Sequence, residues 1–345
     1  MSVAAKHKPR RSPLARSLAA VGAVALAAAM AACASAAGGH PLAVVGNVPL
    51  PGPSNRFDYT SLDPTTNRLY LAHMDADELL VFDVRRRRVV ETIRAPGVHG
   101  VIAVPAIHRV YATATDDRQL LTIDARTGRV LRRAPAGDYP DGLAYAPRER
   151  RVFVSDESGG VDSVFDADGR RIATVSLGGE AGNTTYDEGS GRILVAVQTR
   201  NQLAVVDPRS TRVVRRVDLA GCDHPHGVRV DAPRRLAFVA CDGNARLLTL
   251  DLERLRVIGR ATVGDGPDVL AFDPRLRRLY VAAESGEVAV FAERGRQLRK
   301  LGQWKLADDA HTVAVDPRTH LVYFPLERGR RGAPELRITA PSRPG

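Results

Sequence analysis

The stretch "RLYLAHMDADELLVFDVRRRRVVETI", residues 68–93, holds three short apolar segments separated by two polar turns. The segments are rich in leucine, valine and aromatic side chains, and each is too short for a stable helix, so they indicate strands. The first turn is acidic, and the second is the run of four arginines at Arg85–Arg88. This stretch therefore predicts three consecutive antiparallel strands joined by tight turns.

Tyr70 of this stretch marks a position that recurs seven times along the chain. The spacings between successive copies are 41, 42, 41, 44, 42 and 43 residues. A turn usually precedes the strand, as in "LDPTTN" or "FDPRLR", where proline presets φ and aspartate hydrogen-bonds the backbone beyond it. The copies are Tyr70, Tyr111, Phe153, Leu194, Phe238, Tyr280 and Tyr323.

Each repeat adds one further strand before this pattern, which gives four short strands in about 42 residues and is the signature of a propeller blade. No amphipathic helical pattern separates the strands, which argues against alternating strands and helices. The sequence therefore predicts an all-β fold, a single seven-bladed β-propeller over residues 42–340.

The seventh repeat, which starts at His311, lacks a clear fourth strand. The stretch "PLAVVGNVPLPG" near the beginning of the chain reads like the fourth strands of the other repeats. We therefore predict that residues 42–48 form the outer strand of blade 7. Such closure hides sheet edges that would otherwise pair with other chains.

The quoted stretch, together with "RLYVAAESGEVAVF" at residues 278–291, resembles the YVTN-type repeat of the YncE-like secreted propellers. The resemblance covers essentially all of residues 42–340. It implies a seven-bladed propeller but not one activity, because propellers host many unrelated functions.

Residues 1–33 have the pattern of an export signal, and residues 34–41 and 341–345 read as a linker and a tail. Five basic residues precede the 13-residue apolar segment Leu18–Met30, which is too short to span a bilayer. "MAAC" resembles a bacterial lipobox and predicts lipidation of Cys33, whereas "ASA" at Ala34–Ala36 fits plain cleavage. The favoured expectation is a periplasmic protein held at a membrane through Cys33.

Export favours disulfides because the compartment is oxidising. Without residues 1–33 the chain keeps two cysteines, Cys222 and Cys241, and we predict that they pair. It also keeps 45 basic and 39 acidic residues, so its net charge falls from +11 to about +6.

The turns of the predicted blades sort by charge onto two faces. The turns between strands one and two, and between three and four, carry arginines; we call this side the arginine face. The other turns carry aspartate and glutamate and form the acidic face. The arginine face is either a solvated rim or a surface for an anionic membrane. Nucleic acid is not an expected partner, because few aromatic side chains accompany the arginines.

Counting 12 residues back from each aligned position gives the residue that starts the innermost strand, on the acidic face. Here a side chain can line the central channel. His226, within "HPHG", is thus one copy of a repeated position rather than an isolated motif. The copies are Asp58, His99, Asp141, Gly182, His226, Asp268 and His311. Gly182 leaves a gap that Asn183 or a ligand can fill.

His99, His226 and His311 lie in blades 2, 5 and 7, and three histidines with an open position are a pattern of catalytic zinc. The aspartates would orient them as outer partners. Three hypotheses follow: a propeller that binds a ligand, metal ion or protein at the channel mouth; a metal-dependent lyase or lactonase at the same mouth; and an interaction scaffold whose ring is only a polar lining. No motif identifies a catalytic residue, and Arg56, His73, Tyr139 and His224 are expected only as neighbours of the site.

Overall fold

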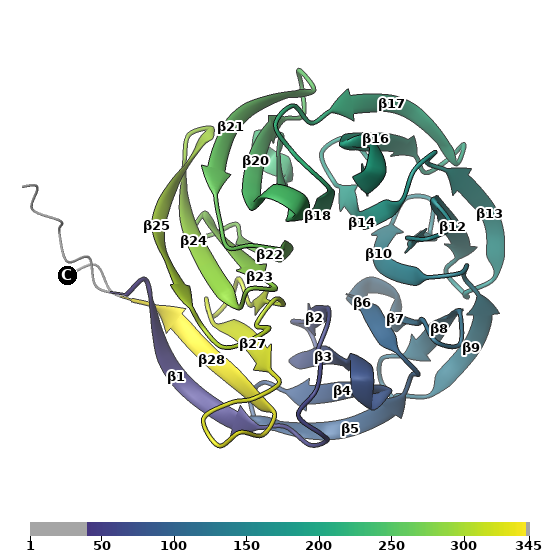
Figure 1. Cartoon of the computed structure of the whole chain (residues 1–345). Coiled ribbons are helices and arrows are strands. Elements are labelled where there is room, and N and C mark those ends of the chain that lie inside the picture. Colours follow the sequence, from purple (N-terminus) through teal and green to yellow (C-terminus); the bar gives the residue numbers. More distant parts are fainter. Residues whose placement is uncertain (1–39, 343–345) are drawn as a thin grey trace, which may run out of the picture. The chain divides into compact units, whose positions relative to one another are not determined.

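The computed structural model describes residues 40–342, so the predicted signal sequence and Cys33 lie outside the described residues. The described chain forms seven four-stranded antiparallel sheets arranged in a ring around a central channel (Figure 1). The prediction of a seven-bladed β-propeller is confirmed. Within the same residues no helix is long and apolar enough to cross a bilayer.

Blades 1 to 6 follow the chain in order, each with its first strand at the channel. Blade 1 is β2 (Thr60–Asp63), β3 (Arg68–His73), β4 (Glu78–Asp83) and β5 (Arg88–Arg94). Blade 2 is β6 (Val98–Val104), β7 (Arg109–Ala114), β8 (Gln119–Asp124) and β9 (Val130–Pro135). Blade 3 is β10 (Pro140–Ala146), β11 (Arg151–Asp156), β12 (Val161–Asp166) and β13 (Arg171–Ser176).

The next three blades repeat this order. Blade 4 is β14 (Ala181–Asp187), β15 (Arg192–Val197), β16 (Gln202–Asp207) and β17 (Arg212–Asp218). Blade 5 is β18 (Pro225–Asp231), β19 (Leu236–Cys241), β20 (Arg246–Asp251) and β21 (Arg256–Thr262). Blade 6 is β22 (Pro267–Asp273), β23 (Arg278–Ala283), β24 (Glu287–Arg294) and β25 (Gln297–Lys305). Five short 3₁₀ turns, η1 (Met74–Ala76), η2 (Pro105–Ile107), η3 (Gln198–Arg200), η4 (Ala232–Arg234) and η5 (Asp242–Asn244), connect strands.

Blade 7 is built from both ends of the described chain, as predicted. Its strands from the channel outward are β26 (Ala314–Val315), β27 (Val322–Leu326), β28 (Glu335–Pro341) and β1 (Leu42–Pro49). β1 pairs antiparallel with β28 from Leu42↔Pro341 to Pro49↔Glu335. The purple and yellow strands lie side by side in Figure 1.

The middle strands of each blade are buried on both faces because neighbouring blades cover them. The aligned residues of the repeat are all buried, from 0% to 2% exposed. The Asp-Pro turns form as expected: the Asp63 carboxylate accepts hydrogen bonds from the backbone N–H groups of Thr65 and Thr66 at 2.8 and 3.3 Å. The repeat therefore encodes both the core and the turns that reverse the chain.

The predicted disulfide joins Cys222 and Cys241, whose Cα atoms are 5.3 Å apart. Cys241 ends β19 and pairs in register with Pro225 of β18, which brings it back to the segment that precedes that strand. The bond fixes the start of the inner strand of blade 5, directly before His226.

We expect reduction of this disulfide to cost about 3 kcal/mol of unfolding free energy, because the bond closes a short loop in the unfolded chain. Urea unfolding with and without reductant measures the difference. The Cys222→Ala/Cys241→Ala variant is the control, and reductant should leave its unfolding midpoint unchanged. Equal midpoints for oxidised and reduced protein would contradict a stabilising role.

Candidate functional site

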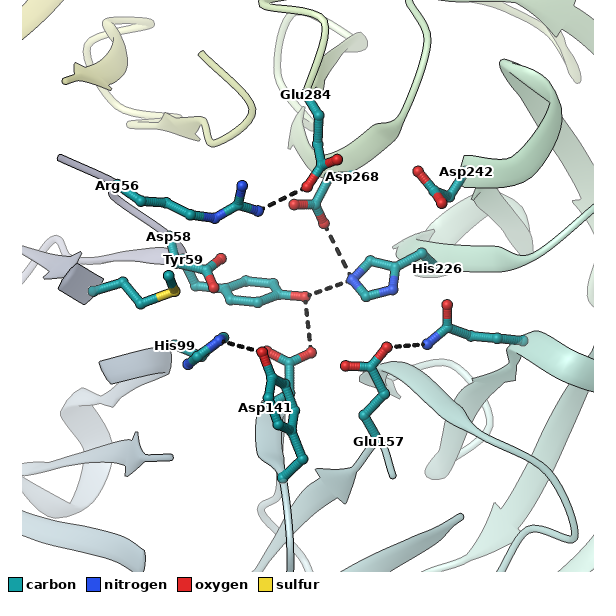
Figure 2. A pocket seen from close by; sticks show the side chains of 13 residues that line it. Arg56, Asp58, Tyr59, His99, Asp141, Glu157, His226, Asp242, Asp268 and Glu284 are labelled. Atoms are coloured by element: carbon teal, nitrogen blue, oxygen red, sulfur yellow. Dashed lines mark hydrogen bonds and ion pairs between the residues drawn. The ribbon is translucent and has the colours of Figure 1, made fainter. Parts of the chain in front are cut away.

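Five of the seven repeated positions line one cavity at the acidic mouth of the channel. It has a volume of about 430 Å³ and is formed at the starts of the inner strands (Figure 2). The five are Asp58, His99, Asp141, His226 and Asp268. The three aspartates are buried, 3% to 8% exposed, whereas the two histidines are partly exposed. The cavity is thus polar and rich in carboxylates.

The two remaining positions lie elsewhere. His311 is 1% exposed and contacts the cavity wall through Asp268, with 4.0 Å between its Nε2 and the Asp268 Oδ2. In blade 4, Gly182 packs against the backbone of His226, and its neighbour Asn183 lines the other half of the channel. Asn183 therefore does not fill the predicted gap at the acidic mouth.

A second repeated position completes the rim. It lies four residues after each aligned residue, where the second strand ends. Five of its seven copies line the cavity: Met74, Glu157, Gln198, Asp242 and Glu284. Counting along the sequence from the aligned residues located the first repeated position, and the same procedure would have located this second position. The sequence analysis placed the acidic turns on one face without singling out Glu157, Asp242 or Glu284 as residues of the cavity.

Tyr59 divides the channel. Its side chain extends from blade 1 across the centre, where its hydroxyl lies 3.3 Å from Nε2 of His226 and donates to Asp141 Oδ2 at 3.5 Å (Figure 2). Tyr59 lines both this cavity and the one on the opposite side. No repeated pattern in the sequence predicts this role, because the equivalent residue in blades 2, 3 and 5 is glycine.

Ion pairs and hydrogen bonds fix the remaining side chains. His226 Nε2 lies 3.2 Å from Asp268 Oδ1, and Arg56 donates to Glu284 at 2.7 Å. His99 Nε2 bonds the Tyr139 hydroxyl at 2.9 Å. Arg56 and Tyr139, expected as neighbours, do line the cavity.

The other two expected neighbours lie away from it. His73 is buried under the segment before β2 and stacks on Phe57, with ring centroids 4.0 Å apart. His224 is half exposed and pairs with the adjacent Asp223 at 3.2 Å. Neither lines the cavity.

The crowding of carboxylates shifts several pKa values. Burial raises the pKa of Asp141 to about 7, with help from the nearby charge of Asp58. Burial alone would lower the pKa of His226, but Asp268 and Asp141 raise it to about 10. Burial also raises the pKa of Asp58. Burial alone would raise the pKa of Asp268 too, but the neighbouring His226 and His311 outweigh it and lower that pKa. At neutral pH His226 is therefore cationic and is held between carboxylates.

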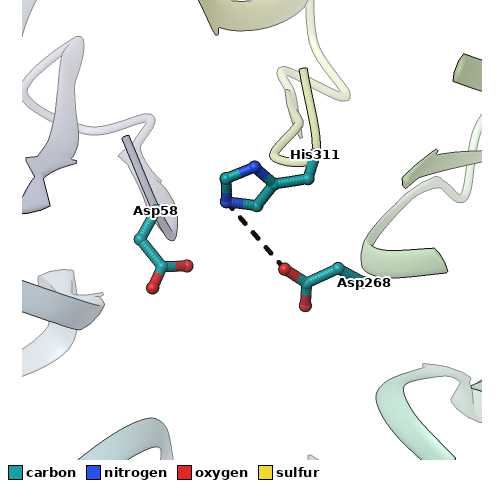
Figure 3. A group of neighbouring side chains, drawn as sticks. All are labelled: Asp58, Asp268 and His311. Carbon is teal, nitrogen blue, oxygen red and sulfur yellow. Dashed lines mark ion pairs between the residues drawn. The ribbon is translucent and has the colours of Figure 1, made fainter. Parts of the chain in front are cut away.

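Within residues 40–342 one group of side chains lies close enough together to hold a metal ion: Asp58, Asp268 and His311 (Figure 3). One ligand atom from each lies within 4.8 Å of the others, and all three residues are buried. The group contains only one of the three histidines predicted as ligands. The structure does not bring His99 and His226 together with His311, since ligands spread evenly over blades 2, 5 and 7 face each other across the channel. The observed group comes from blades 6, 7 and 1, which adjoin each other.

No protein-family model matches the chain. It is 30% identical over 104 residues to the uncharacterized protein YncE of Salmonella typhi and to that of Salmonella typhimurium. Each match spans 30% of this chain and 30% of the relative. The chain also superposes on a chain of the solved Kuenenia stuttgartiensis Hydrazine Synthase with a TM-score of 0.71, at 13% identity, over 86% of this chain and 97% of that one.

The likeness to the solved structure shows the fold alone, because the identity is so low. The match to YncE and the seven blades together support a YncE-like propeller. The YncE-like relatives and the disulfide also fit an exported protein.

Proposed function

We propose that this chain is an exported, lipid-anchored propeller whose acidic channel mouth holds a divalent transition-metal ion through Asp58, Asp268 and His311. The observation that carries the proposal is the His311 ring. It is 1% exposed, and its Nε2 has no hydrogen-bond partner in the described chain, yet it faces two buried carboxylates (Figure 3). A buried polar atom without a partner is costly, so it points to a ligand.

The second ring nitrogen of His311 supports this assignment. Its Nδ1 lies 3.0 Å from the backbone oxygen of Asp309 and 3.2 Å from that residue's Oδ1. Both partners are acceptors, so Nδ1 carries a proton. Burial alone would lower the pKa of His311, but Asp309, Asp268 and Asp58 raise it to about 9, so a bound metal ion would replace the proton on Nε2. Metal-binding histidines commonly have such an acceptor behind the distal nitrogen, where it fixes the tautomer.

The group offers two carboxylates to a cation. They belong to Asp58 and Asp268, and the cationic His226 offsets part of their charge, since its Nε2 lies 3.2 Å from Oδ1 of Asp268. One imidazole and two carboxylates suit zinc or a similar ion, with a further coordination position open toward the cavity. That position is where a small-molecule or protein ligand would reach the metal.

A metal-dependent lyase or lactonase is the second candidate, and it would use the same site. Asp141 favours it: its carboxyl borders the cavity and has a pKa of about 7, because burial disfavours its charge. An acid or base with a pKa near the working pH is suited to proton transfer. Both candidates require the metal, so protein that binds none would exclude both.

For the opposite side of the disc we propose contact with an anionic membrane surface through the arginine face. The lipid anchor proposed at Cys33 would hold the protein near that surface. Several of these arginines are paired with turn aspartates, such as Arg254 with Asp251 at 3.1 Å and Arg318 with Asp316 at 3.2 Å. The attraction would therefore depend on the arginines that lack such partners.

Calorimetric titration of the metal-free protein with zinc, copper and nickel tests the metal site. We expect one ion per chain and a loss of affinity of at least about 100-fold in His311→Ala, since the variant removes one of three protein ligands. Asp58→Asn and Asp268→Asn should each weaken binding by about 10- to 100-fold or more.

His99→Ala is the matched control. His99 lines the same cavity but bonds Tyr139 and lies outside the group, so we expect its affinity within about threefold of wild type. If His99→Ala weakens binding as much as His311→Ala, the ligands are the three histidines instead. If no ion binds wild type more tightly than His311→Ala, the ring is a polar lining.

A further inference from the structure

A second cavity, of about 720 Å³, occupies the half of the channel beyond Tyr59. Its walls are the inner strands, and its rim includes prolines from the turns between first and second strands: Pro64, Pro233, Pro274 and Pro317. Those turns belong to the arginine face, so the cavity opens on that side. Its volume is in the range of small-molecule sites in proteins.

Three charged residues line this cavity: Glu188, Arg229 and Asp231. The residue nine before each aligned residue lines the cavity in all seven blades. The copies are Ser61, Ile102, Ala144, Thr185, Arg229, Ala271 and Ala314. Six are small or apolar and uncharged, so Arg229 of β18 stands alone as the cation of this ring.

The guanidinium of Arg229 forms no hydrogen bond or ion pair within residues 40–342. Its neighbours on the same face are paired: Arg235 binds Asp187 at 2.7 Å, and Arg234 lies 3.4 Å from Asp231. Arg229 retains access to water in the channel, but the surrounding walls lower its pKa, and the charge of Glu188 opposes this shift. A guanidinium that is open to the cavity and has no ion-pair partner favours an anionic ligand.

The nearby acids do not supply that partner. Asp231 lines the cavity but is buried and paired with Arg234. Glu188 is exposed in the turn after β14, at the rim. Within residues 40–342 no acid pairs with Arg229, so its guanidinium is free to bind an anionic ligand.

The rest of the lining is predominantly apolar and sets the shape of the ligand's uncharged part. It includes Leu62, Val101, Leu143, Tyr145, Leu270, Phe272 and Val313. One guanidinium in an apolar chamber suits a single carboxylate on a hydrophobic body, whereas a phosphate would call for more donors.

From these contacts we infer that the cavity on the arginine face binds an organic monocarboxylate, with the carboxylate on Arg229 and its apolar part against the inner strands. The arginines around the opening favour binding of the carboxylate, because a positive rim raises the local concentration of anions. The site is separate from the proposed metal site, since Tyr59 lies between the two cavities.

Calorimetric titration with acetate, hexanoate and octanoate tests the inference, with 1-octanol as the uncharged analogue of octanoate. We expect affinity to rise with chain length and octanoate to bind at least about 10-fold more tightly than 1-octanol. Arg229→Gln should weaken the affinity for octanoate by about 10- to 100-fold and leave the affinity for 1-octanol unchanged. Arg229→Lys should keep part of the affinity, because it keeps the charge but not the planar pair of donors.

Arg148→Gln is the control, because it removes the same charge from an exposed turn on the same face without touching the cavity. Its octanoate affinity should stay within about twofold of wild type, as should that of His311→Ala at the other mouth. The inference is overturned if none of the three carboxylates binds below about 1 mM, a range weaker than most specific sites. Equal binding of octanoate by wild type and Arg229→Gln would also overturn it.

Discussion

A variant that lacks residues 42–48 should lose more than about 4 kcal/mol of unfolding free energy and melt at least about 10 °C below wild type. These residues form most of β1, the outer strand of blade 7. Leu42 is 3% exposed and packs in a core cluster shared by blades 6 and 7. The deletion removes this side chain and leaves the long strand β28 as an open edge. Thermal unfolding followed by circular dichroism measures the change.

Two substitutions on the same strand distinguish the contribution of its buried side chain to stability from that of the strand's backbone pairing. Leu42→Ala should cost about 2–5 kcal/mol, whereas Val44→Ala, at a side chain that is 55% exposed, should change stability by less than about 0.5 kcal/mol. An unchanged melting temperature in the deletion variant would refute closure of the ring by β1.

Asp162→Asn should stabilise the protein at pH 8 by up to about 4 kcal/mol and have little effect at pH 4. Asp162 lies in β12 with no exposed surface, between blades 3 and 4, and its described partner is the Thr184 hydroxyl at 3.1 Å. At the same register the other six blades carry Leu79, Leu120, Leu203, Leu247, Val288 and Leu336. The aspartate thus replaces a core aliphatic residue.

The pH dependence follows from the direction of the shift. Burial raises the pKa of Asp162 to about 7, although the bond from Thr184 lowers it. Because this value lies above the unfolded one, near 3.9, the folded protein favours the protonated carboxyl. The wild type has its full stability below about pH 4. It loses stability as the pH rises from there through 7, because the unfolded chain ionises more readily than the folded one. Asparagine does not ionise and so removes that loss.

Urea unfolding of both proteins between pH 4 and pH 8 measures the effect. Asp138→Asn makes the same chemical change at an exposed side chain. Its unfolding free energy should therefore differ from that of wild type by less than about 0.5 kcal/mol at both pH 4 and pH 8. A difference between wild type and Asp162→Asn that is constant with pH, or that favours wild type at pH 8, would contradict the prediction.

The sequence predicted the features that recur from blade to blade and missed those that belong to a single blade. The aligned aromatic residues, the Asp-Pro turns and the closing strand follow from local patterns that recur, so counting was enough to predict the fold. The disulfide was also predictable, because only two cysteines remain after residue 33. The position 12 residues before each aligned residue did gather most of its copies at one cavity.

The proposed metal ligands were harder to predict, because counting blades says nothing about how regular each blade is. In blades 2 to 6 the repeated residue is the second residue of the inner strand. In blades 1 and 7 the inner strands begin late, at Thr60 and Ala314, so Asp58 and His311 lie in irregular segments before them. This irregularity is local to the joint where the ring closes, and there the two side chains approach Asp268.

Tyr59 changes how the energetics of the ring should be treated. Blades of a repeat protein normally contact only their neighbours, so that stability is close to a sum of repeat and nearest-neighbour terms. The Tyr59 hydroxyl breaks that rule, because it joins blade 1 to Asp141 in blade 3 and to His226 in blade 5. These three blades share no sheet, yet a change in any one of them alters a bond held by the other two. We therefore expect these three blades to be coupled in unfolding, so that a substitution in one of them changes the stability of the other two.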